Sequence, residues 1–195
     1  MPFWKDWGPA YKEGWCGSFN VVREVQMAGD GTLRFLPIRE LESLRTDGNS
    51  QDKLVLETEE TEIKAGDGVS FELKFKIDLE NTDADKMLLY LRCGEGKKTV
   101  CTFDFRHAEL SVDRSNSDGW SVGTSHSVMY LAGKKELDVH IFSDQSSLEI
   151  FTDNYQNNHS NNIFAGNEQN GIKMCACGGK VTVTDIAAYG IEACE

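Results

Sequence analysis

The stretch VSFELKFKIDL, from Val69 to Leu79, decides the fold class of this chain. Apolar and polar residues alternate along its whole length, with Phe71, Leu73 and Phe75 in the apolar set. Because neighbouring side chains of a β-strand point to opposite faces, such a strand buries one face and exposes the other. This pattern is typical of an antiparallel sheet that packs on one side only.

The chain after this stretch continues as short strand-like segments with almost no helical period. Breaks rich in Gly, Asn, Asp and Ser separate them. The predicted strands are 86–93, 99–105, 109–113, 127–132, 136–143, 147–152, 171–177 and 180–191. They predict an all-β fold, a two-sheet antiparallel β-sandwich of concanavalin or jelly-roll type with about five or six strands in each sheet. The polar segment 152–162 is expected to be a loop.

The segment LRFLPIRELESLR, from Leu33 to Arg45, joins this sandwich to what precedes it. It begins as a strand, breaks at Pro37, and continues with Ile38, Leu41 and Leu44 at the spacing of one helical face. We therefore expect one short linker helix near 38–45. The predicted domains are an N-terminal extension over 1–32 and a β-sandwich over 33–195.

Charge and hydropathy narrow the class of partner. The chain has 32 acidic and 20 basic residues and a net charge of -12, with no basic cluster to attract a phosphate backbone. Nucleic acid and membranes are therefore not expected as partners. The sequence has no apolar run of membrane-spanning length and no pattern of an export signal. We expect a cytoplasmic location, or an extracellular one if the module is cut from a secreted enzyme.

The six cysteines are scattered, at positions 16, 93, 101, 175, 177 and 194. In a chain long enough to fold without staples, this favours reduced thiols over a disulfide framework. Cys175 and Cys177 form a C-x-C pair, but a zinc site would need a second pair or a histidine cluster beside it. We predict no metal and no cofactor.

Residues 13–45, EGWCGSFNVVREVQMAGDGTLRFLPIRELESLR, resemble a known segment of glycoside hydrolase family 32. There the chain leaves the catalytic propeller and enters the C-terminal β-sandwich, through a Gly-Trp, a Pro-Arg-Glu-Leu strand, an Asp-Gly turn and a Pro-Val-x-Glu-Leu-x-x-Leu-Arg linker. LSVDRSNSDG at 110–119 and ELDVHIFSDQSSLEIFTDN at 136–154 resemble two later motifs of the family in the same order. The family includes invertases, inulinases, levanases and sucrose-6-phosphate hydrolases.

The resemblance covers the sandwich and not the catalytic propeller. Family members hydrolyse their substrates with an Asp in Asn-Asp-Pro-Asn-Gly, an Asp in Arg-Asp-Pro and a Glu in Glu-Cys, and none of these motifs occurs in this sequence. We therefore predict no catalytic residue. The resemblance implies a non-catalytic module that binds a fructose-containing carbohydrate, of fructan or sucrose type. An O-glycosyl hydrolase of β-fructofuranosidase type with a relocated site is the enzymatic alternative.

The sandwich is also similar to fructan-binding modules, which grip a terminal fructose with acidic residues and an arginine. By that analogy the candidate carbohydrate-binding residues are Asp113, Arg114, Glu149 and Arg106. Trp120 would add a stacking surface beside Arg114. A salt-bridge cluster that pins strands together is the alternative explanation for the charged members of this set.

Two further candidates lie in polar segments, Glu40 in the linker and Tyr155 in the amide-rich stretch 152–162. Glu40 is interpreted either as a ligand contact or as part of a satisfied charge network. For the earlier Arg23-Glu24 pair, bracing of propeller blades is favoured over contact with sugar hydroxyls. Asp144 is expected to build a tight turn by bonding its own backbone, which is favoured over ligand binding.

A third class of function stays open beside binding and catalysis. In this alternative, the chain is a structural remnant of a β-fructosidase, and its aromatic-rich first residues pack against a partner. Its partner would be a second copy of itself, as a homo-oligomer, or a separate catalytic propeller.

Overall fold

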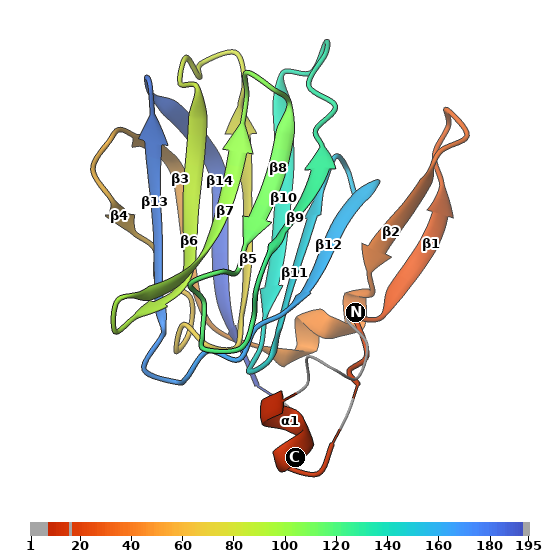
Figure 1. The fold of residues 1–195 in the computed structure, drawn as a ribbon. Helices are drawn as coiled ribbons and strands as arrows, with labels where there is room; N and C mark the ends of the chain where they lie inside the picture. Colours follow the sequence, from red (N-terminus) through yellow and green to blue (C-terminus); the bar gives the residue numbers. More distant parts are fainter. Residues whose placement is uncertain (1–7, 16, 193–195) are drawn as a thin grey trace.

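The computed structural model describes residues 8–15 and 17–192. Two antiparallel sheets of six strands each face one another, and a two-stranded hairpin stands beside them (Figure 1). The prediction of an all-β sandwich with one short linker helix is confirmed. Cys16 and Cys194, two of the predicted thiols, lie outside the described residues.

The first sheet has the strand order β12-β11-β10-β5-β14-β3. Its strands are β3 (Arg45–Leu56), β5 (Phe71–Asp78), β10 (Glu136–Ser143), β11 (Ser147–Thr152), β12 (Asn157–Asn162) and β14 (Val181–Ile191). The alternating stretch forms β5, near the middle of this sheet. Phe71 and Leu73 are 0% exposed, so the apolar set of the alternation faces the core as expected.

The second sheet has the order β4-β13-β6-β7-β8-β9. Its strands are β4 (Thr61–Glu62), β6 (Lys86–Gly94), β7 (Lys97–Asp104), β8 (Glu109–Asp113), β9 (Thr124–Val128) and β13 (Gly171–Cys177). Side chains of both sheets interdigitate between them. Phe75 from β5 meets Phe103 from β7 edge to face, with ring centroids 6.4 Å apart, an arrangement that aromatic pairs favour.

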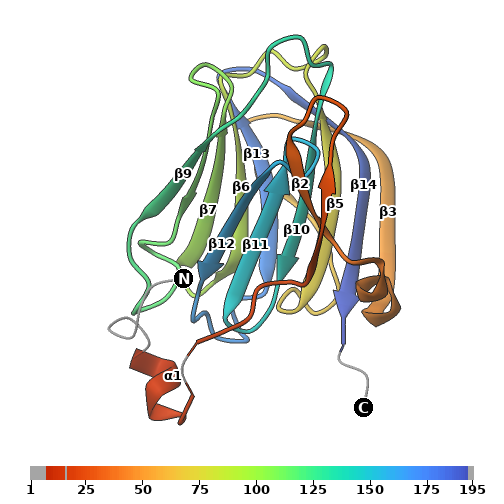
Figure 2. The same ribbon diagram turned by 90° about the vertical axis from the view of Figure 1, so that its right-hand side faces the viewer.

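The chain reaches the sandwich through α1 (Gly8–Lys12) and a hairpin of β1 (Arg23–Met27) and β2 (Leu33–Pro37). Figure 2 shows this hairpin in front of the first sheet. The expected linker helix is a 3-10 helix, η2, over Arg39–Leu44. The division into an extension and a sandwich at residue 33 stays a prediction, and the pairing of β1 with β2 spans that position.

The expectation that residues 152–162 form a loop holds for the turn at 153–156 and is wrong for the residues that follow it. Asn157–Asn162 is strand β12, paired antiparallel with β11 at the edge of the first sheet. Its inward side chains are polar because they bond to β9 across the open side of the sandwich. His159 is 5% exposed, and its ring nitrogens contact the hydroxyls of Ser125 at 3.0 Å and Ser127 at 2.6 Å. Polar partners replace the apolar packing that the sequence pattern would require.

Strand β3 was absent from the predicted set, since its sequence RTDGNSQDKLVL is mostly polar. It forms the other edge of the first sheet, where it pairs only with β14 within the described residues. An edge strand with charged side chains resists pairing with other chains. β9 begins at Thr124 and ends at Val128. It therefore starts three residues before the predicted strand 127–132.

No helix in the described part of the chain is long and apolar enough to cross a membrane. Cys93, Cys101, Cys175 and Cys177, the cysteines of that part, are free thiols. Cys175 and Cys177 lie on β13, and the Cys175 thiol is 3.9 Å from the Tyr90 hydroxyl.

Candidate functional site

A groove of about 500 Å³ lies between the outer face of the first sheet and the chain that enters the sandwich. Leu41 and Leu44 of η2 line one side of the groove, and Phe19 of the entering segment lines another. Phe142 lines the groove from β10. The i, i+3 spacing of the two leucines places both on the helix face that lies over the sheet. Most of the apolar wall therefore comes from η2 and from the chain segment that precedes β1.

The polar wall of the groove comes from the turn between β10 and β11. Asp144 Oδ1 accepts hydrogen bonds from the Ser70 hydroxyl and the Gln145 amide, each at 2.8 Å. The Asp144 amide donates to the Ser147 carbonyl at 2.9 Å, so the expected turn is present. Within residues 8–15 and 17–192, Asp144 Oδ2 and the Ser147 hydroxyl make no hydrogen bond. One carboxylate oxygen builds the turn, and the other is available to a ligand.

Glu149 lies deeper in the groove and is tied to the entering chain. Its side chain is 2% exposed and forms an ion pair with Arg23 of β1. The Val21 amide donates to its Oε1 at 2.5 Å. Arg23 also donates to Ser160 Oγ at 2.9 Å, so it ties the entering chain to the sandwich, and its interpretation as a brace for propeller blades stays a prediction. Both oxygens of Glu149 are occupied, and its role in the groove is to fix the wall.

A second charge network lies next to the groove on the same sheet face. Arg45 donates to the two oxygens of Glu72 at 2.5 and 2.8 Å, and His140 Nε2 is 2.8 Å from Glu72 Oε1. Burial alone would raise the pKa of Glu72, but the hydrogen bonds from Arg45 and His140 outweigh it and hold that pKa below its usual range. Burial lowers the pKa of His140. The carboxylate is thus ionised and fully engaged, and the network is structural.

Tyr155, a predicted site residue, lies against this network. Its hydroxyl is 3.2 Å from His140 Nδ1. It follows Asp153 and Asn154 in a turn where the three residues have φ values of 54°, 54° and 65°. The left-handed region costs a non-glycine residue roughly 1–2 kcal/mol, so the surrounding contacts must hold this turn in place. Tyr155 lines a smaller cavity of about 160 Å³ that shares Phe142 with the groove.

Three other predicted residues share one loop after β8. Arg114 donates to the carbonyls of Asn162 at 2.9 Å and Val122 at 3.1 Å. Asp113 Oδ1 accepts from the Ser115 amide at 2.8 Å. Trp120 is 51% exposed. Asp113 and Arg114 therefore hold their loop together, and Lys12 Nζ lies over the Trp120 ring, 5.2 Å from its centroid.

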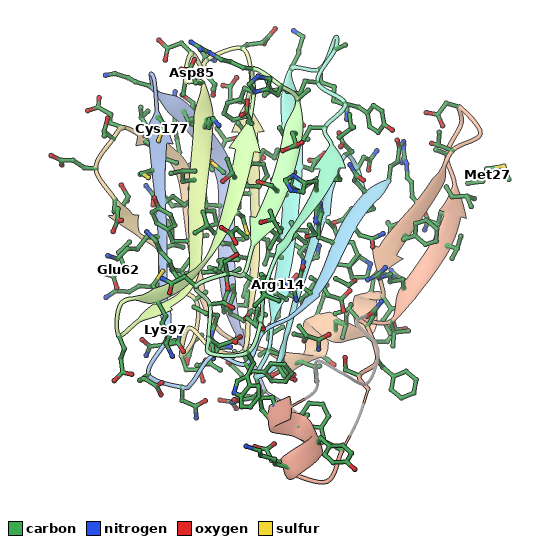
Figure 3. All side chains as sticks on the ribbon, viewed as in Figure 1. Met27, Glu62, Asp85, Lys97, Arg114 and Cys177 are labelled. Atoms are coloured by element: carbon green, nitrogen blue, oxygen red, sulfur yellow. The ribbon has the colours of Figure 1, made fainter. Side chains whose placement is uncertain are left out.

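The last two predicted residues lie elsewhere. Glu40 is exposed on η2, and Arg106 forms an ion pair with Asp85 at 2.5 Å. Figure 3 shows Asp85 at the opposite end of the sandwich from Arg114. The seven predicted residues do not converge in one pocket, and their role in binding carbohydrate stays a prediction.

Sequence reasoning missed Phe142 and Phe19 as lining residues, and for Asp144 it favoured a turn over ligand binding. A signal for Phe142 was present. In ELDVHIFS, Phe142 occupies the same outward face of the strand as Glu136, Asp138 and His140. An aromatic residue on an otherwise polar outward face indicates that another segment covers that face. Nothing in the sequence places Phe19 beside β10.

The described part of the chain is thus a two-sheet β-sandwich, entered through a 3-10 linker that closes a groove on its outer face. The family model described as glycosyl hydrolases family 32 C terminal matches residues 40–190. The chain belongs to this family, as a C-terminal domain of glycoside hydrolase family 32.

Curated relatives and solved structures agree with this assignment. A sucrose-6-phosphate hydrolase of Zymomonas mobilis is 30% identical over 149 residues, which cover 76% of this chain and 28% of that protein. A fructan beta-fructosidase of Streptococcus mutans is 28% identical, covering 90% of this chain and 13% of that protein. The sucrose-6-phosphate hydrolase structure from Lactobacillus gasseri matches with a TM-score of 0.74 at 21% identity, over 94% of this chain and 36% of that one. The chain thus spans less than a third of the curated relatives named here, which are glycoside hydrolases.

Proposed function

We propose that this chain is a non-catalytic module that binds a fructose-containing carbohydrate, of fructan or sucrose type, in the groove between η2 and the first sheet. The observation that carries the proposal is the pairing of a free carboxylate oxygen on Asp144 with the apolar wall of Phe142 and Leu41 in one groove of about 500 Å³. Sugars present hydroxyls that donate to carboxylates and apolar C–H faces that pack on aromatic rings. The relatives suggest the ligand class, since they include a sucrose-6-phosphate hydrolase, a fructan beta-fructosidase and a levanase of Bacillus subtilis.

Binding without hydrolysis is supported by the state of the acids at the groove. A retaining glycosidase needs two carboxyl groups about 5 Å apart, one ionised and one protonated. Glu149 is neutralised by Arg23, and Glu72 by Arg45. Neither is free to attack an anomeric carbon or to protonate a leaving group.

The proposal is tested by titrating the isotope-labelled chain with sucrose, inulin oligosaccharides and levan oligosaccharides while backbone amide shifts are recorded. Saturable shifts at Ser70, Asp144 and Ser147 are expected. The absence of any response at millimolar ligand would overturn the binding claim. Release of reducing sugar from the same ligands, lost in a Glu149→Gln variant, would instead revive the enzymatic alternative.

A second function, docking to a catalytic β-propeller of the same family, is favoured by the hairpin. Val25 is 58% exposed, Met27 is 76% exposed and Leu33 is 47% exposed, and Figure 3 shows Met27 at the outer end of the hairpin. Exposed apolar side chains on an edge strand favour association. Sedimentation of the chain alone and with a family 32 propeller distinguishes a heterologous complex, a homo-oligomer and a monomer, and a monomer in both samples would contradict docking.

A further inference from the structure

A second cavity lies on the other sheet, away from the groove. It has a volume of about 370 Å³ and lies between the β6–β7 hairpin and β13, and three lysines, Lys97, Lys98 and Lys173, line it together with Tyr90, Cys93 and Glu60. It shares no lining residue with the groove. Figure 3 shows Lys97 on the side of the molecule opposite to Met27 and the hairpin.

The residues that line this cavity carry a net positive charge, whereas the chain as a whole is negatively charged. Three lysines against one glutamate leave an excess of two positive charges, in a chain whose net charge is -12. Of these three lysines, only Lys173 forms an ion pair within the described residues, with Glu60 at 2.8 Å, and the charge of Glu62 also acts on it. In a protein with 32 acidic residues, lysines gathered without matching carboxylates leave a local positive potential that attracts an anion.

Lys98 is held in position by an aromatic ring and not by an acid. Its Nζ lies 3.5 Å from the centroid of the Tyr90 ring, a cation–π contact that orients the ammonium group, and its charge also acts on Glu60 without an ion pair. Burial, and next the contact with Cys175, raises the pKa of Tyr90 to about 12. Burial also raises the pKa of the Cys93 thiol. Both groups therefore stay uncharged near neutral pH and do not offset the lysines.

Glycines keep the floor of the cavity free of side chains. A Cβ on Gly94 would lie 2.4 Å from the Glu168 carbonyl oxygen, and one on Gly171 would lie 3.0 Å from the Cys93 carbonyl oxygen. Gly96, with a φ of +76°, has open space at its Cβ position. The close approach of the two segments requires glycine, and it leaves the lysine side chains as the groups that a ligand meets.

We propose that this cavity binds a small phosphomonoester, with the phosphate between Lys98 and Lys173 and its sugar or polyol group in the remaining space. A phosphomonoester carries a charge of about −2 at neutral pH, which matches the excess of two positive charges. Lysine binds phosphate as a point charge with three donors. The volume exceeds that of a phosphate alone, so the sugar or polyol group of an ester makes contacts there that the free ion lacks.

The test is an amide-shift titration of the whole chain with fructose 6-phosphate, inorganic phosphate and fructose. We expect saturable shifts at Tyr90, Gly94 and Lys98 with the ester, weaker binding of inorganic phosphate, and no shift there with fructose. Affinity should fall as salt is raised, because the contact is between charges near the surface. No response to the ester at 10 mM, or an ester that binds no more tightly than inorganic phosphate, would overturn the proposal.

Substitutions sharpen the test in both directions. Lys98→Gln with Lys173→Gln should weaken binding of the ester at least about tenfold, while Lys53→Gln, on an exposed part of β3, should leave it unchanged. Glu60→Gln should tighten binding a few-fold because it frees Lys173 and removes the only acid of the cavity. Equal affinity in the wild type and the double lysine variant would contradict the site. Neutral fructosides report on the groove, so failure here is distinct from failure of the carbohydrate proposal.

Discussion

Arg23 on β1 forms an ion pair with Glu149 on β11, 126 residues later in the chain. The pair ties the strand that precedes the sandwich to the sandwich face. Arg23 also stacks on Phe151, with its guanidinium carbon 5.0 Å from the ring centroid. The entering chain is therefore part of the folded unit, and Glu149 holds it against the first sheet through Arg23 and the Val21 amide, where it forms one wall of the groove.

Replacing Arg23 by Met should destabilise the chain by roughly 3 kcal/mol, because it leaves Glu149 buried without a cation. Urea denaturation followed by tryptophan fluorescence measures the change. In the double variant Arg23→Met with Glu149→Gln, the stranded charge is gone, so the loss of stability should be smaller than in Arg23→Met. A double variant that is less stable than Arg23→Met would contradict this account of the pair.

Arg92 ties the groove turn at Asp144 to the loop before β13. It is 0% exposed and donates to the carbonyls of Gln169 at 2.9 Å, Asp144 at 3.0 Å and Ala165 at 3.1 Å. Burial lowers its pKa. Arg92→Met should cost several kcal/mol, since each buried carbonyl left without a donor costs roughly 1–3 kcal/mol. Arg106→Met, at an exposed ion pair, is the matched control and should change the denaturation midpoint little.

His159 should make stability depend on pH. Burial, and next the charge of His126, lowers its pKa in the folded chain below the ordinary value of 6.5. The unfolded chain therefore binds a proton more readily below about pH 6.5, so stability is complete above that pH and falls as the pH drops through and below it. Unfolding free energies measured from pH 8 to pH 5 should show this decline.

The His159→Gln variant provides the control for that pH series. It can keep hydrogen bonds to Ser125 and Ser127 but cannot gain a proton. The difference between the wild type and this variant should be constant above pH 7 and change in favour of the variant below pH 6.5. Parallel curves across the whole range would show that His159 does not titrate on unfolding.

Much of the sandwich could be predicted because its strands bury one apolar face. Strands β8, β10, β11 and β13 have the predicted bounds, and each alternates or is continuously apolar. β12 could not be predicted in this way, since its buried residues include His159, Asn161 and Asn162. Their hydrogen bonds to β9 and its neighbouring loop are contacts between segments far apart in sequence, and no local pattern carries them.

The groove could be predicted even less. Glu149 was identified as a candidate from a family analogy, but its partner Arg23 was assigned to absent propeller blades. Asp144 was favoured as a turn residue, and its Oδ1 does accept the hydrogen bonds that build the turn. The turn pattern does not show that its Oδ2 faces the groove without a hydrogen bond from the described residues. A site built from the ends of β10, η2 and the entering segment depends on how three distant segments meet, and only the fold supplies that information.

Asp144→Asn separates the binding role of Asp144 from its turn role. Asn keeps an Oδ1 that accepts from Ser70 and Gln145, so the denaturation midpoint should change little. The free oxygen becomes an amide, and affinity for a fructose-containing sugar should fall about tenfold, the scale of one charge-assisted hydrogen bond. Asp52→Asn, on an exposed part of β3, is the control. Equal affinity of the Asp144→Asn variant and the wild type would remove Asp144 from the site.

The most direct measurement is the amide-shift titration of the wild-type chain with levan and inulin oligosaccharides and with sucrose. If the groove binds fructose-containing carbohydrate, saturable shifts will cluster at Leu41, Ser70, Asp144 and Ser147 and will be absent with glucose. Shifts confined to the loop around Trp120 would move the site to that loop. No saturable shift with any of the three ligands would contradict carbohydrate binding by this chain.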